Sequence, residues 1–367
     1  MKIQAAVLYN LNEKLQVETL DLAPPQAGEV LVKMGAAGVC HSDYHVITGD
    51  ASQVLPCVLG HEGAGTVVEV GDNVTAVSVG DHVILNWLPH CGTCFYCQND
   101  QTNLCTAYQY AIWPGTMLDE TCRLSKAGQP YRHLASIATW ANYSVVPQEF
   151  CVVIRDEVPF DVAALVGCGV TTGIGAVINR AQVKSGSCVA VFGVGGVGLS
   201  VIMGASLAGA GRIIAVDRVS TKEPIAKQFG ATDFVMAGPD ANDAIRDLTE
   251  GRGADYVFEV VGNPKLQQAC LDATRPGGVV VFVGMTAPGT SFSLDGRIIN
   301  RDEKTIIGSF YGSGHNPRDF NQFCNLCVDG KLPIDQLITH RYALDQINQA
   351  IDDMLTGEIG RGVVVFE

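Results

Sequence analysis

The sequence has no surplus of basic residues, no long uninterrupted apolar run and no segment typical of a signal peptide. Its 24 Lys and Arg are outnumbered by 38 Asp and Glu, which gives a formal net charge of -14. A negative chain without a basic stripe repels phosphate backbones and anionic lipid, so we expect neither a nucleic acid nor a membrane partner. The apolar run VVVFVG, at residues 279–284, is far too short to span a bilayer.

The N-terminal segment MKIQAAVLYNLNEKLQVETL alternates apolar and polar residues and soon meets charges. It has neither the apolar core nor the small-residue cleavage site of a signal peptide. We therefore expect a cytoplasmic protein, in which the 13 cysteines serve as thiols or metal ligands rather than disulfides.

With 367 residues, 47% of them hydrophobic, the chain is long enough for two domains with large cores. The first 150 residues carry short valine-rich runs punctuated by glycine, which predicts β-structure. From Cys188 onward, apolar strands alternate with helical segments, and this α/β rhythm predicts a doubly wound parallel sheet. The candidate strands are Cys188–Phe192, Arg212–Val216, Asp233–Met236, Asp255–Val260, Val279–Val283 and Thr305–Phe310. Residues 344–355 follow as a helix that Gly357 ends, and RGVVVFE closes the chain as a strand.

A glycine-rich turn follows the first of these strands. The hexapeptide GVGGVG matches the G-x-G-x-x-G pattern of dinucleotide-binding proteins, and a helix and a second strand come after it. Its cofactor-binding candidates are Gly193, Gly195, Gly196, Val197 and Gly198. Asp217, 19 residues after the last glycine, would accept hydrogen bonds from an adenosine ribose and repel a 2′-phosphate, which favours NAD. A helix-capping or solvated aspartate is the alternative, and Lys222 is either a ribose contact or an exposed helix lysine.

Four cysteines form a compact cluster in the segment CGTCFYCQNDQTNLC. Cys91, Cys94, Cys97 and Cys105 follow the spacing C-x2-C-x2-C-x7-C. Four thiolates at such spacing complete a closed tetrahedral zinc site, whose role is structural because no position stays open. An iron–sulfur cluster is the rival interpretation, although its fourth cysteine would come much sooner.

Three more residues have the chemistry of metal ligands. Cys40 lies in GVCHSDYH, His61 in LGHEGAG and Cys168 in LVGCGVTTG. They are far apart in the sequence, so spacing alone does not link them. Each could instead be a buried residue of the core.

The motifs, taken in order, resemble those of zinc-dependent alcohol dehydrogenases of the medium-chain dehydrogenase/reductase family. The similarity runs from AAGVCHSD through GHEGAGTVVEVG and GVGGVGLSVIMG to LITH near the end of the chain. It implies a GroES-like catalytic domain over residues 1–170 and 313–367, with a structural zinc lobe at 91–105, and a Rossmann NAD-binding domain over 171–312. It also implies two zinc ions per chain, NAD as cofactor, and a homodimer or, alternatively, a tetramer.

By this resemblance Cys40, His61 and Cys168 bind the catalytic zinc, a Lewis acid that would activate an alcohol for hydride transfer to NAD. Ser42 and His45 match the relay that carries the alcohol's proton outward. Histidine suits the last step because it titrates near neutral pH. A plain surface histidine is the alternative for His45.

The remaining assignments also come from the resemblance. Glu62 follows His61 and matches a carboxylate close to zinc, either an alternate ligand or an ordinary neighbour of the ligands. Thr172 would lie beside the nicotinamide, and Arg361 would hold the pyrophosphate. His41 stands where many relatives have an arginine at the pyrophosphate.

The substrate is expected to be a small-molecule alcohol or aldehyde. The pocket candidates Trp87, Tyr110 and Leu134 are large and apolar, which favours a medium-sized apolar primary alcohol, aromatic or allylic. Glutathione-linked formaldehyde dehydrogenases carry charged pocket residues where this chain has the neutral side chains of Gln109 and Ala51. The alternatives are an S-(hydroxymethyl)glutathione dehydrogenase, an alcohol dehydrogenase with permanently bound NAD, and a non-catalytic NAD-binding protein.

Overall fold

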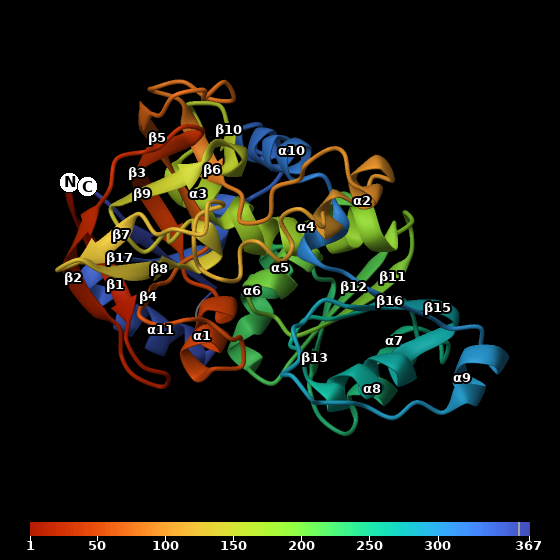
Figure 1. Cartoon of the computed structure of the whole chain (residues 1–367). Coiled ribbons are helices and arrows are strands. Elements are labelled where there is room, and N and C mark those ends of the chain that lie inside the picture. Colours follow the sequence, from red (N-terminus) through yellow and green to blue (C-terminus); the bar gives the residue numbers. More distant parts are fainter. Residues whose placement is uncertain (359) are drawn as a thin grey trace. The chain divides into compact units, whose positions relative to one another are not determined.

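The computed structural model describes residues 1–358 and 360–367, and the chain divides into two compact units (Figure 1). Unit 1 comprises Met1–Cys168 and His315–Glu367, and unit 2 comprises Gly169–Gly314. Unit 2 is thus inserted into unit 1, and its ends lie two residues outside the expected range of 171–312.

Unit 1 is built from a closed barrel and a seven-stranded sheet. The barrel strands are β1 (Lys2–Leu8), β2 (Gln16–Leu22), β7 (Leu124–Lys126), β8 (Gln129–His133) and β4 (Cys57–Val58). The sheet strands are, in spatial order, β10 (Cys151–Val153), β6 (His82–Leu85), β5 (Gly63–Val70), β3 (Glu29–Gly38), β18 (Arg361–Val365) and β17 (Ile338–Tyr342), with β9 (Tyr143–Pro147) also pairing with β3. In β1, exposed Lys2 and Gln4 alternate with buried Ile3 and Ala5, the period-two pattern of a strand with one face on a core.

The helices of unit 1 are α1 (His41–Thr48), α2 (Phe95–Gln98), α3 (Phe160–Leu165), α10 (Asn316–Val328) and α11 (Ile347–Thr356). A short 3₁₀ turn (Leu344–Gln346) precedes α11, and Gly357 ends the helix at φ +71°. Only glycine adopts this left-handed conformation without strain, so the predicted helix stop is confirmed.

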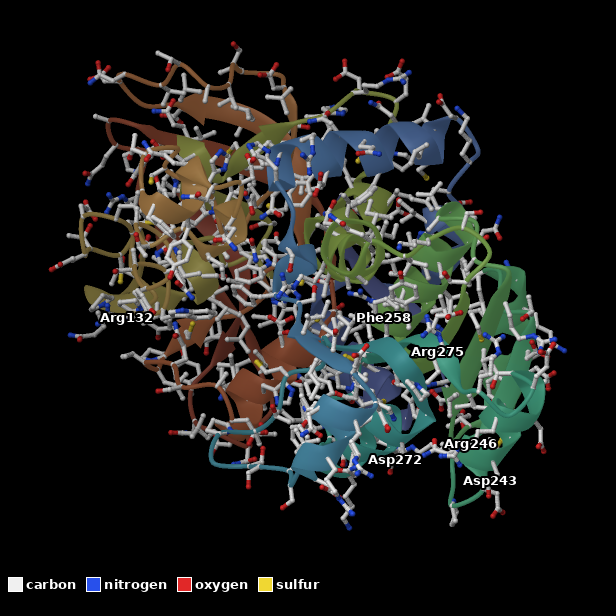
Figure 2. The ribbon with its side chains drawn as sticks, turned by 90° about the vertical axis from the view of Figure 1, so that its right-hand side faces the viewer. Arg132, Asp243, Arg246, Phe258, Asp272 and Arg275 are labelled. Carbon is white, nitrogen blue, oxygen red and sulfur yellow. The ribbon has the colours of Figure 1, made fainter. Side chains whose placement is uncertain are left out.

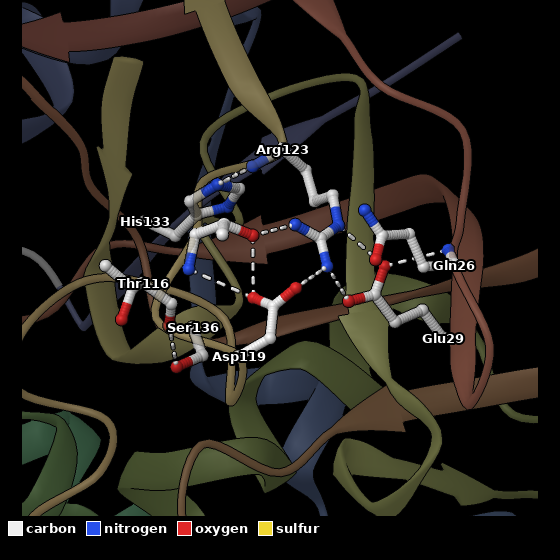
Figure 3. A network of polar contacts seen from close by, with 8 residues as sticks. Gln26, Glu29, Thr116, Asp119, Arg123, His133 and Ser136 are labelled. Carbon is white, nitrogen blue, oxygen red and sulfur yellow. Dashed lines mark hydrogen bonds and ion pairs between the residues drawn. The ribbon is translucent and has the colours of Figure 1, made fainter.

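A buried ion-pair network ties a loop of unit 1 to the start of β3 (Figure 3). The Arg123 guanidinium donates to both Glu29 oxygens, at 2.8 and 2.5 Å, and to the Asp119 carboxylate at 2.8 Å. The Arg123 backbone N–H donates to His133 Nε2 at 3.0 Å. Because that nitrogen accepts, the proton of the neutral His133 ring sits on Nδ1.

Unit 2 is a six-stranded, fully parallel sheet with helices in its connections. The strands are, in spatial order, β13 (Asp233–Met236), β12 (Arg212–Asp217), β11 (Cys188–Phe192), β14 (Ala254–Glu259), β15 (Thr274–Phe282) and β16 (Thr305–Gly308). The helices are α4 (Thr171–Gly175), α5 (Gly196–Leu207), α6 (Glu223–Gln228), α7 (Ala241–Leu248), α8 (Pro264–Ala273) and α9 (Gly296–Arg301). The predicted doubly wound sheet is confirmed.

Strand β15 begins five residues earlier than the sequence predicts. Thr274 pairs with Ala254, and the register then shifts before Tyr256 pairs with Val279. This irregularity accommodates the segment Pro276–Gly278, whose residues are typical of turns and hide the strand in the sequence.

Arginines tie the helices and strands of unit 2 together (Figure 2). Arg246 of α7 pairs with Asp243 at 2.9 Å and donates to the Asp272 carbonyl of α8 at 3.2 Å. Arg275 of β15 pairs with Asp255 of β14 at 2.5 Å.

The helical run Phe160–Ala181 is long and apolar enough to cross a membrane by length and composition alone, with a mean hydropathy of 1.7. It is not an uninterrupted apolar run, because Asp161, Thr171 and Thr172 divide it. Moreover, 83% of that window is buried inside the protein. Burial of this kind is what the core helix of a globular fold shows.

Candidate active site and dinucleotide turn

The four cysteines of the zinc lobe converge, with their sulfur atoms all within 4.8 Å of one another. Cys94 Sγ lies 3.5 Å from Cys97 Sγ and 3.9 Å from Cys105 Sγ. Backbone N–H groups point at the sulfurs, as that of Cys94 does at Cys91 Sγ (3.3 Å). Hydrogen bonding, led by the Cys97 backbone N–H, lowers the pKa of Cys94 to about 6. Hydrogen bonds also lower the pKa of Cys91 to about 7, and four thiols of which two are made acidic by their neighbours fit a structural zinc ion.

A second cluster gathers Cys40, His61, Glu62 and Cys168, whose donor atoms also lie within 4.8 Å of one another. Cys40 stands at the start of α1, His61 and Glu62 directly precede β5, and Cys168 lies in a π-helical turn after α3. Three separate segments of unit 1 thus bring together the two thiols and the imidazole that the sequence could not link.

Asp43 orients the imidazole of this cluster. Its Oδ1 accepts from His61 Nδ1 at 3.0 Å and from the Gly60 backbone N–H at 3.1 Å, and its side chain is fully buried. His61 Nε2 is left buried without a hydrogen-bond partner among the described residues. The hydrogen bond from Cys168 holds the pKa of Cys40 well below its ordinary value. A thiolate and an orphaned imidazole nitrogen side by side fit a metal ion.

Glu62 forms a buried ion pair with Arg361 at the start of β18. Arg361 also donates to the Val39 carbonyl at 3.2 Å, and its side chain is only 6% exposed. A Cβ at Gly38 would lie 1.9 Å from Glu62 Oε2, so only glycine leaves room for this carboxylate. Glu62 therefore lies both among the donor atoms and against Arg361, and the pyrophosphate contact of Arg361 stays a prediction.

The relay candidates lie on α1, immediately after Cys40. The Cys40 thiol points at Ser42 Oγ, 3.7 Å from the sulfur, and His45 follows three residues later, on the same side of the helix. His45 Nδ1 lies 3.3 Å from Asp50 Oδ2, and the ring is 25% exposed. His41 is the exposed first residue of the same helix.

Aromatic side chains adjoin the cluster on one side. The Trp87 ring meets that of His61 edge to face, with centroids 6.2 Å apart, and Trp113 at 6.4 Å. Leu134 is buried, whereas Tyr110 is 70% exposed and does not share this burial. Trp113 was not among the pocket candidates, since nothing local marks it as a neighbour of Trp87, and it is itself 44% exposed.

In unit 2 the glycine-rich turn joins β11 to α5. Gly193 has φ +102°, and a Cβ at Gly198 would lie 1.9 Å from the Gly193 carbonyl oxygen, so both positions require glycine. A Cβ at Gly195 would meet nothing within 4 Å. The turn is thus tightly packed at Gly193 and Gly198, where helix and strand meet. It has free space at Gly195, the glycine that faces the pyrophosphate in this motif.

Asp217 is the last residue of β12, and its carboxylate accepts a hydrogen bond from the backbone of the glycine-rich turn. It is 7% exposed and accepts from the backbone N–H of Val194 (2.7 Å) and of Val219 (3.0 Å). Lys222 donates to its carboxylate at 3.2 Å. Thr172 is half-buried in α4. Ribose binding by Asp217 and Lys222, and the nicotinamide contact of Thr172, stay predictions.

Two clusters of metal-binding character and a parallel sheet with a dinucleotide turn define the class of a zinc-binding dehydrogenase. Residues 26–156 match the family model of the alcohol dehydrogenase GroES-like domain, and residues 196–329 match that of zinc-binding dehydrogenases. The chain belongs to the zinc-dependent alcohol dehydrogenase family, oxidoreductases that act on CH–OH groups. Zinc and a nicotinamide dinucleotide are therefore its cofactors.

Similar proteins cover the whole chain. The S-(hydroxymethyl)glutathione dehydrogenase of Paracoccus denitrificans is 40% identical over 100% of both chains. The class-3 alcohol dehydrogenase of Dictyostelium discoideum is 38% identical over 98% of this chain and 97% of its own. The crystal structure of benzyl alcohol dehydrogenase from Acinetobacter calcoaceticus matches with a TM-score of 0.94 and 32% identity, over 100% of each chain.

Proposed function

We propose that the protein is an NAD-dependent alcohol dehydrogenase that interconverts primary alcohols and aldehydes at the cluster of Cys40, His61 and Cys168. The observation that carries the proposal is the buried Nε2 of His61, which faces two thiols and has no hydrogen-bond partner among residues 1–358 and 360–367. A donor set of two cysteines and one histidine leaves a fourth position open, as catalytic zinc sites do.

Zinc, when bound, supplies a Lewis acid that makes the substrate hydroxyl acidic near neutral pH. The residues of the chain bind the ion and orient its ligands. Cys40, His61 and Cys168 hold the ion, and Asp43 keeps the His61 ring in the tautomer that offers Nε2. The buried Glu62–Arg361 pair lies beside the thiols, either as a reserve ligand or as a neighbour that sets the local charge.

Ser42 and His45 would carry the substrate proton away. A hydroxyl both accepts and donates, so Ser42 passes a proton on without keeping a charge. His45, whose side chain is 25% exposed, is the last group of the relay, from which water takes the proton.

The glycine turn would hold the dinucleotide, and Asp217 would select NAD over NADP. Its carboxylate is held by backbone N–H groups and by Lys222 at the end of β12. A ribose 2′-hydroxyl donates to such a carboxylate, whereas a 2′-phosphate is repelled by it.

Two substrates are candidates. The names of curated relatives, such as the one from Paracoccus denitrificans, favour S-(hydroxymethyl)glutathione, and they support it better than an apolar alcohol. The aromatic ring of Trp87 against His61, together with the benzyl alcohol dehydrogenase neighbour, favours an aromatic or allylic primary alcohol. Gln109 and Ala51 add no charge for a glutathione carboxylate.

The deciding experiment compares both substrates on zinc-replete protein with excess NAD. We would follow NADH formation with S-(hydroxymethyl)glutathione, benzyl and cinnamyl alcohols, and ethanol. Activity confined to S-(hydroxymethyl)glutathione would refute the hypothesis of an apolar alcohol substrate. Activity that rises with the size of the apolar alcohol would refute the hypothesis of a glutathione substrate. Absence of NADH from every substrate would refute the proposed function, unless NAD is found in the dialysed and denatured protein. Bound NAD would identify an enzyme that keeps its cofactor between turnovers. The cytoplasmic location and the homodimer also stay predictions. Size-exclusion chromatography with light scattering tests the homodimer.

A further inference from the structure

The turn after α1 places a carboxylate against the ring of His45. Asp50 Oδ2 lies 3.3 Å from His45 Nδ1. Gly49, at φ +85°, reverses the chain, and the Ala51 backbone N–H returns to the His45 carbonyl at 2.9 Å. The two side chains are five residues apart, and this turn brings them together.

The same carboxylate oxygen is fixed from a second side. The Thr48 hydroxyl donates to Asp50 Oδ2 at 2.8 Å. Hydrogen bonds from Thr48 and from His45 lower the pKa of Asp50, so its carboxylate is ionised at neutral pH. An ionised carboxylate only accepts hydrogen bonds, and the nitrogen that faces it must therefore carry a proton.

We propose that Asp50 is a positioning residue of the proton relay, which holds His45 in the Nδ1–H tautomer and so offers Nε2 as the proton acceptor. The inference deepens the proposed function and rests on it. When Nε2 takes the proton, the contact with Asp50 keeps the ring oriented until water removes the proton. The arrangement is that of an acid–histidine pair in which the acid orients the ring and is not itself protonated.

The kinetic test uses Asp50→Asn, which keeps the shape of the side chain and removes its charge. We expect the transient rate of NADH formation in the first turnover to fall about three- to tenfold. The dissociation constant for NAD and the zinc content should stay at wild-type values. In a His45→Gln background the same change should have no further effect, because the ring that Asp50 orients is gone.

A matched control is available in the same unit. His82 Nδ1 faces Asp156 Oδ1 at 3.9 Å, and the His82 side chain is 26% exposed, close to the 25% of His45. Asp156→Asn removes the negative charge beside a histidine outside the proposed site. This change should leave the transient rate of NADH formation unchanged.

A spectroscopic test does not depend on activity. In ¹⁵N-histidine-labelled holoenzyme at a pH where the ring is neutral, the His45 signals should show the Nδ1–H tautomer, and Asp50→Asn should shift them toward the Nε2–H form. His133, whose Nε2 accepts from Arg123, supplies an internal reference for the Nδ1–H pattern. His45→Gln assigns the signal.

Three outcomes would overturn the proposal: an Nε2–H tautomer for His45 in the wild type, an unchanged transient rate in Asp50→Asn, or an equal loss in the His45→Gln background. In each of these cases a wild-type enzyme that oxidises alcohols keeps the proposed function intact. Conversely, a wild type inactive on every alcohol refutes the proposed function, and the relay role of Asp50 with it.

Discussion

Replacing Asp43 with asparagine should weaken metal binding at the cluster of Cys40, His61 and Cys168 and leave binding at the four-cysteine cluster unchanged. Asp43 is fully buried, and its Oδ1 accepts from His61 Nδ1 and from the Gly60 backbone N–H. Asparagine keeps an acceptor oxygen but loses the charge. A hydrogen bond to a charged group contributes about 1.5–3 kcal/mol, and a neutral one about 0.5–1.5 kcal/mol. The His61 bond should thus weaken by about 1 to 1.5 kcal/mol, which makes zinc binding about five- to twelvefold weaker.

The assay is competition with a chelator, followed by a zinc-responsive dye. Wild-type protein should release two zinc ions per chain in separate phases, and Asp43→Asn should advance only one of them. The four-cysteine set serves as the internal reference, because its sulfurs contact one another, whereas Asp43 accepts hydrogen bonds from His61 and Gly60. Asp319→Asn, a change at another buried aspartate, is the matched control. Equal release of both ions in wild type and Asp43→Asn would refute the reasoning that Asp43 supports the His61 ligand.

Three further changes test the structure. Gly38→Ala should displace the Glu62 carboxylate, which a Cβ would approach to 1.9 Å, and lower activity more than tenfold; unchanged kinetics would contradict the close fit. Cys94→Ser should reduce the zinc content from two ions to one and lower the midpoint of thermal unfolding. Finally, burial lowers the pKa of His133 to about 3, below the value of about 6.5 in the unfolded chain. The unfolded state therefore takes up a proton that the native state refuses, and the free energy of unfolding falls by up to about 1.4 kcal/mol per unit as the pH drops below about 6.5. His133→Asn should flatten this slope in thermal unfolding between about pH 7 and pH 5, and equal slopes would argue against a buried neutral ring.

Features encoded over a few neighbouring residues were predictable from the sequence. Strands β11 and β13 have the predicted bounds, because a short apolar run between turn residues is a local signal. The glycine turn was equally visible, since its tight turn and its close helix–strand packing demand glycine at fixed spacing. The convergence of the four lobe cysteines likewise follows from two-residue gaps.

The pocket candidates stay predictions. Trp87 and Leu134 are buried, whereas Tyr110 and its neighbour Trp113 are 70% and 44% exposed. Side chains from loops meet at a pocket wall, and no periodic pattern along the chain records which way a loop residue points.

The sequence by itself thus determined the α/β unit, its dinucleotide turn and the family, because each is written in local patterns whose physical demands are strict. Tertiary structure decided the rest. Glu62 and Arg361 are 299 residues apart and share one buried ion pair, and Asp43 finds His61 only because α1 packs where the chain enters β5. Such contacts depend on how strands close into a sheet and which side chains the closure buries together, and a buried charge must find its partner there.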